Sequence, residues 1–171
     1  MLKHFFSTPS SRTVSLLRVV LGMVMFAHGA QKLLGWFGGY GFDGTIGFFT
    51  QSLGIPAPVA TLVVIAEFFG GLGLMTGFLT RLSAAGITAV MVGAIHFTHF
   101  GNGFFMNWTG QQAGEGYEYH LLVIALALAL VVKGGGWASI DGVIGRRLAT
   151  APAQQKPGTM DVVDARGRSH A

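Results

Sequence analysis

Eight ionisable side chains lie in or at the ends of stretches of sequence that are otherwise strongly apolar. A charge at the centre of a membrane costs about 3 kcal/mol or more, so such a group faces a protein interior or a water-filled cavity. Histidine, glutamate and lysine can bind ligands or transfer protons there. We therefore predict a ligand-binding or proton-relay site from these residues, which are Arg18, His28, Lys32, Glu67, His96, His99, Glu118 and His120.

Glu67 is the only acidic residue deep inside one of these stretches. Three basic residues can pair with it, because Arg18, His28 and Lys32 fall within an arc of about 80° on one helix. Depth slightly favours His28, whereas Arg18 has the longer reach and keeps its proton. Two interpretations are open, and they are compatible. The pair is structural and locks two helices, or Glu67 also binds a ligand or relays a proton.

A second group of polar residues lies near the ends of two later apolar stretches. His96 and His99 are one helical turn apart, so both can reach a common ligand. With Glu118 and His120 they are consistent with a metal site, a polar pocket or a structural role. Haem ligation between His28 and one of these histidines is a further alternative. The loose spacing favours the pocket or the structural role, so we predict no metal ligand.

Four apolar stretches must position these residues. Only 11% of the 171 residues are charged and 51% are hydrophobic, whereas a soluble domain averages about 25% charged residues. A membrane-spanning helix needs about 20 apolar residues. We therefore predict an all-α integral membrane four-helix bundle over residues 1–148 and a disordered cytoplasmic tail over 149–171. The predicted spans are about 14–34, 55–79, 82–100 and 117–132.

The lysines and arginines alternate between the connecting segments and orient the chain. They occur before the first span, in the turn after the second span and after the fourth span. They are absent from the connecting segments 35–53 and 101–116. By the positive-inside rule, both termini are cytoplasmic and both longer loops face outward. Apolar residues at helical spacing within 44–53 predict a short helix on the outer surface. The basic residues form no patch, so we expect no nucleic-acid partner.

Short motifs spread over residues 16–141 add a family resemblance. They are Leu17-Arg18, Phe26-Ala27-His28-Gly29-Ala30-Gln31-Lys32, Ala66-Glu67-Phe68-Phe69-Gly70-Gly71, Gly77-Phe78-Leu79-Thr80-Arg81, Gly116-Tyr117-Glu118 and Ser139-Ile140-Asp141. In these motifs the chain resembles the DoxX family of small bacterial membrane proteins. The resemblance implies a protein of the bacterial cytoplasmic membrane, and some relatives oxidise thiosulfate with quinone as acceptor or act in oxidative-stress complexes. The family pattern carries over onto Arg18, His28, Lys32, Glu67 and Glu118.

Three functions are open at this point, and whether the chain is an enzyme is not decided. The first is a redox-linked subunit that handles quinone together with a partner protein, which predicts a ligand-sized cavity at Glu67 and His28. The second is a non-enzymatic scaffold or assembly factor, which predicts that these residues are fully paired without a cavity. The third is a binder or transporter of a small molecule or lipid. The G-x-x-x-G motif at Gly73–Gly77 allows close helix packing and permits a homo-oligomer.

Overall fold

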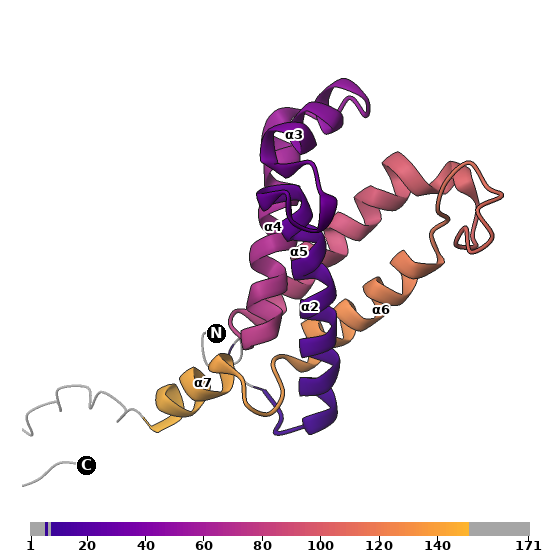
Figure 1. Ribbon diagram of the computed structural model, residues 1–171. Helices are drawn as coiled ribbons and strands as arrows, with labels where there is room; N and C mark the ends of the chain where they lie inside the picture. The colour runs from indigo at the N-terminus through magenta and orange to yellow at the C-terminus, as the bar shows by residue number, and fades with distance from the viewer. Residues whose placement is uncertain (1–5, 7, 151–171) are drawn as a thin grey trace, which may run out of the picture.

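The structure is a computed structural model that describes residue 6 and residues 8–150. Within these residues all regular secondary structure is helical, without strands, which confirms the predicted all-α class (Figure 1). The predicted tail begins inside the last helix, and its remainder, residues 151–171, lies outside the described residues. The elements are α2 Arg12–Leu34, η1 Trp36–Gly38, α3 Gly41–Gln51, α4 Ala57–Thr76, α5 Thr80–Ala94, η2 Ile95–His99, η3 Phe100–Asn102, α6 Glu118–Lys133 and α7 Ile140–Thr150.

Three of these helical segments are long and apolar enough to cross a membrane, namely Arg12–Leu34, Ala57–Thr76 and Thr80–Asn102. Their length and composition agree with the predicted membrane character of the chain. The fourth predicted span corresponds to α6, which has only 16 residues. At 1.5 Å per residue such a helix is about 24 Å long, less than the hydrocarbon core of about 30 Å. A four-span bundle with both termini in the cytoplasm therefore stays a prediction.

The helix ends follow from local sequence. The Ser11 side chain accepts a hydrogen bond from the backbone N–H of Val14 and caps the start of α2. Gly77 ends α4 with a φ of 71°, a left-handed conformation that glycine adopts without a steric penalty. α3 forms in the first loop, at the place where a short helix was predicted.

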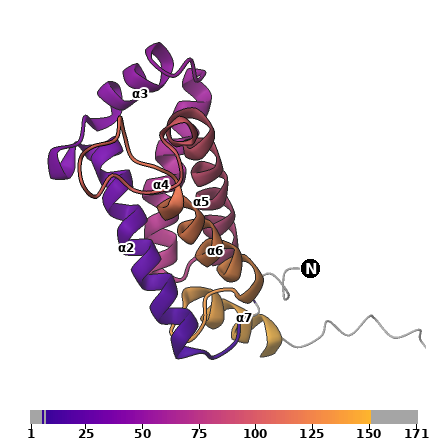
Figure 2. The same cartoon turned by 90° about the vertical axis from the view of Figure 1, so that its right-hand side faces the viewer.

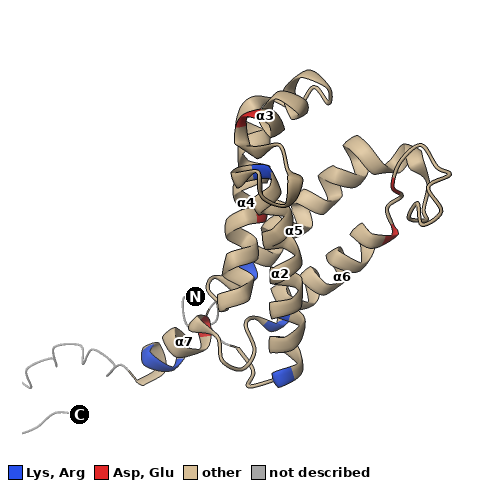
Figure 3. Cartoon of the chain, viewed as in Figure 1, with Lys and Arg blue, Asp and Glu red and all other residues tan. Residues whose placement is uncertain are grey.

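The helices α2, α4, α5 and α6 lie side by side, with α3 across one end and α7 at the other (Figure 2). Most lysines and arginines lie toward the α7 end, which is the predicted cytoplasmic end (Figure 3). Two glycines allow α2 and α4 to touch backbone to backbone. A Cβ at Gly29 would overlap the backbone of Phe68, and a Cβ at Gly71 would overlap that of Phe26. Such close approach is typical of membrane helices.

Two charged residues fix the turn between α4 and α5 at the α7 end. Arg18 is 2% exposed, and its guanidinium donates to the carbonyl oxygens of Leu74 and Met75 at the end of α4. Both carboxylate oxygens of Asp141 accept backbone N–H groups at the start of α5, each at 2.8 Å. A cation at a helix C-terminus and an anion at an N-terminus both match the helix dipole. These residues therefore stabilise the turn.

Candidate functional site

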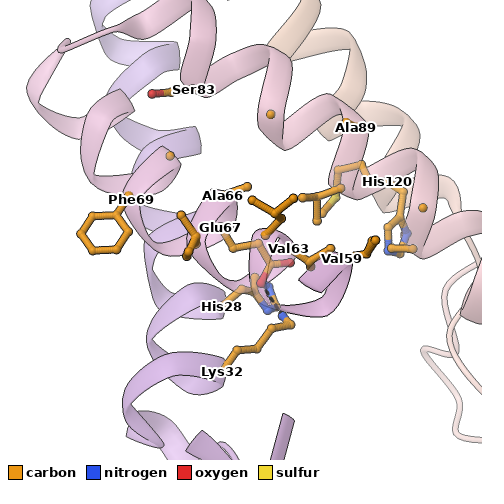
Figure 4. Close-up of a pocket in the computed structure, with 18 of the residues that line it drawn as sticks. His28, Lys32, Val59, Val63, Ala66, Glu67, Phe69, Ser83, Ala89 and His120 are labelled. Carbon is orange, nitrogen blue, oxygen red and sulfur yellow. Dashed lines mark ion pairs between the residues drawn. The ribbon is translucent and has the colours of Figure 1, made fainter. Parts of the chain in front are cut away.

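A groove opens between α4 and α5 as the two helices diverge from this turn toward the α3 end. Near the turn, a Cβ at Gly73 would lie 2.5 Å from Ser83 Oγ. Further along, a Cβ at Gly86 would lie 3.8 Å from Ala66 Cβ, and one at Gly93 would meet no atom within 4 Å. The groove has a volume of about 1330 Å³. Its walls are mostly apolar, and polar side chains from α2, α4, α6 and η2 line part of it (Figure 4).

An ion pair lies on the α2–α4 wall of the groove. Lys32 Nζ is 2.6 Å from Glu67 Oε2, and the two side chains are 25% and 5% exposed. His28, one turn before Lys32 on α2, also lines the groove, and Figure 4 shows it beside the pair. The expected depth in the membrane slightly favoured His28 as the partner of Glu67, but in the structure Lys32 makes the ion pair. Helical side chains lean toward the helix N-terminus, so the long Lys32 side chain reaches back to the depth of Glu67.

The opposite wall carries an aromatic group from α6 and η2. The rings of His99 and His120 have centroids 4.1 Å apart, and those of Tyr119 and His120 are 5.5 Å apart. Tyr119 Oη and His120 Nδ1 are buried and have no hydrogen-bond partner among the described residues. A buried polar atom without a partner is costly. A ligand with polar groups would satisfy both atoms.

Three of the eight predicted residues lie outside this groove. Arg18 lies at the α4–α5 turn and donates hydrogen bonds to the end of α4 instead of pairing with Glu67. His96 is exposed and contacts Phe97. It separates from His99 because residues 95–99 form a π-helix, whose wider turn moves the two side chains onto different faces. Glu118 accepts a hydrogen bond from the backbone N–H of Met106 at 2.9 Å and so orders the loop before α6.

No group of three or more His, Cys, Asp or Glu side chains that could hold a metal ion occurs among the residues that the structure describes. Tyr119 is not among the eight residues that the sequence predicts for the site. Its position next to His120 at the start of an apolar stretch was the available signal. The groove thus unites five of the predicted residues with Tyr119. The five are His28, Lys32, Glu67, His99 and His120.

Comparisons with known proteins agree with this description. The DoxX family model matches residues 13–100, which run from the second residue of α2 past the end of α5 and include the Lys32–Glu67 pair. A Bacillus subtilis (strain 168) protein named "Putative oxidoreductase CatD" is 31% identical over 115 residues, 67% of this chain and 75% of that protein. An Escherichia coli (strain K12) protein named "Inner membrane protein YqjF" is 30% identical over 137 residues, 76% of this chain and 90% of that protein. No solved structure matches the chain.

Proposed function

Because the chain belongs to the DoxX family of membrane proteins, we propose that it is a redox-linked subunit of the bacterial inner membrane whose groove binds a quinone. One similar protein is named as an oxidoreductase and another as an inner membrane protein, and both names support this proposal. In this proposal a partner protein supplies the electrons that reduce the quinone. In this proposal both termini face the cytoplasm, as the distribution of lysine and arginine indicates.

The groove is the observation that carries the proposal. Binding sites for small molecules have volumes of about 300–1,000 Å³, mostly apolar walls and a few polar groups. The groove, at about 1330 Å³, is larger than this range but has the same mostly apolar walls and few polar groups, with room for a planar head and part of an apolar tail. The scaffold alternative predicted fully paired residues without such a cavity. The groove, together with the unpartnered Tyr119 Oη and His120 Nδ1, favours ligand binding over that alternative.

The residues of the groove suit a quinone in three ways. A quinone takes up two electrons and two protons when it is reduced. The Tyr119 hydroxyl and the Lys32 ammonium can donate hydrogen bonds to carbonyl oxygens. His28 Nδ1 or Nε2 and the Glu67 carboxylate can hold and deliver protons. The apolar walls of α4 and α5 exclude water and strengthen these polar interactions.

Quinone binding to the purified protein in lipid nanodiscs tests the proposal. We would titrate a short-chain quinone by calorimetry against the wild type, Glu67→Gln and Gly93→Leu. Gly93 lines the groove and a Cβ there meets no atom within 4 Å, so a leucine side chain at this position can extend into the groove. Both variants should lose about tenfold or more in affinity, which corresponds to about 1.4 kcal/mol.

The matched control is Gly47→Leu. Gly47 lies on α3, does not line the groove, and also has no atom within 4 Å of an added Cβ. It should bind quinone as the wild type does. Absence of binding by the wild type, or unchanged affinity in both groove variants, would contradict the proposed function.

A further inference from the structure

Two histidines lie together where the groove meets the loop before α6. His99 comes from η2 and His120 from the first turn of α6, and their ring centroids are 4.1 Å apart. His120 is 6% exposed, and its Nδ1 has no hydrogen-bond partner among the described residues. His99 is half-buried, and the nearby loop residue Glu115 is exposed. The pair therefore extends from the interior of the groove to the surface of the loop.

The hydrogen bond of His99 determines which of its nitrogens is free. His99 Nδ1 lies 2.8 Å from the carbonyl oxygen of Glu115. A carbonyl oxygen only accepts, so Nδ1 carries the hydrogen and a neutral His99 keeps its lone pair on Nε2. An imidazole can accept a proton at one nitrogen and release one from the other, which is why histidines act as proton shuttles.

On its inner side, His120 continues toward the ion pair. The Tyr119 ring lies 5.5 Å from His120 and 6.3 Å from His28, centroid to centroid. His28 in turn lines the groove beside Lys32 and Glu67. A series of proton-carrying groups therefore leads from Glu67 to the loop.

We propose that His120 and His99 exchange protons between the groove and the water at the 103–117 loop. The use of this route rests on the proposed function, because protons must reach or leave a quinone as it changes its redox state. If the termini are cytoplasmic, the route opens to the outer face of the membrane. His120 and His99 then transfer protons into and out of the groove, whereas Lys32 and Tyr119 donate hydrogen bonds to the ligand.

Nuclear magnetic resonance of the full-length protein, labelled with ¹⁵N-histidine in nanodiscs, tests the route without any quinone. The measured quantity is the rate at which the His120 imidazole N–H exchanges with water. His99→Phe and His99→Gln should both slow this exchange by about tenfold or more, since each removes the acid–base group of the shuttle. His96→Phe, which changes an exposed histidine outside the groove, should leave the rate as in the wild type.

An exchange rate of His120 that is unchanged in both His99 variants would overturn the route. Backbone amide spectra of each variant establish that the fold is retained, and two different substitutions guard against a local packing defect. The quinone titration separates this result from the proposed function. If the His99 variants slow the exchange but the wild type binds no quinone, the proton route stands and the proposed function is refuted. If the wild type binds quinone but the exchange is unchanged in the His99 variants, the proposed function stands and the proton route is refuted.

Discussion

Removing the two partners of the Lys32–Glu67 ion pair should have unequal consequences. At the observed 2.6 Å, two unit charges attract each other by about 6 kcal/mol at an effective dielectric constant of about 20. Much of this attraction offsets the desolvation of both groups, but loss of one partner leaves the other charge buried without compensation. Such a loss typically costs about 3–5 kcal/mol. The Glu67 residue is 4% exposed, so Lys32→Met should destabilise the protein within this range.

Glu67→Gln should cost less, about 1–3 kcal/mol. Glutamine can still accept a hydrogen bond from Lys32. The Lys32 side chain, which is 25% exposed, can also turn its ammonium toward water. The double variant Lys32→Met with Glu67→Leu should regain stability to within about 1 kcal/mol of the wild type, because apolar residues often replace a buried ion pair without loss. It should nevertheless bind no quinone.

Equilibrium unfolding in mixed micelles with increasing dodecyl sulfate, followed by circular dichroism, gives the free energy of unfolding of each variant. The same four proteins are then titrated with quinone. Equal destabilisation by the two single variants would refute the reasoning from burial. A stable double variant that binds quinone normally would show that the ion pair is only structural.

Two further predictions concern the contacts that build the groove. Asp141→Asn should lower the free energy of unfolding by about 2 kcal/mol or more, because a charge-assisted cap of α5 is lost, whereas Asp43→Asn on the exposed first turn of α3 should change it little. Equal melting temperatures for these two variants would exclude the capping role. Gly29→Ala should cost about 1–3 kcal/mol through overpacking and should also weaken quinone binding, because an added Cβ overlaps the backbone of Phe68. Gly93→Ala, with free space around its Cβ, is the control for stability only, and a comparable loss of unfolding free energy in it would contradict the packing argument.

The sequence predicted the types of residue that form the site, but only part of the predicted residues lie together in the structure. A charge within an apolar stretch is visible in any sequence, and five of the eight residues found in this way line the groove. Arg18 looks the same in the sequence as Lys32, yet it binds the end of α4. The difference depends on the loop at 134–138, which brings the carbonyl oxygens of Gly135 and Ala138 to the Arg18 guanidinium. The pattern of apolar and polar residues within α2 does not predict where these distant segments lie.

The helices and their membrane character could be derived from the sequence because they depend on local properties. Apolar composition, the cap at Ser11 and the left-handed turn at Gly77 act over a few neighbouring residues. The pairing of Lys32 with Glu67, the widening between α4 and α5, and the meeting of His99 with His120 depend on the rotation, tilt and separation of helices that are distant in the chain. Backbone contact at Gly29 and Gly71 and the π-turn at 95–99 set these quantities. A difference of one helical turn or a few ångströms changes which side chains meet, so the site emerges only when the helices are packed.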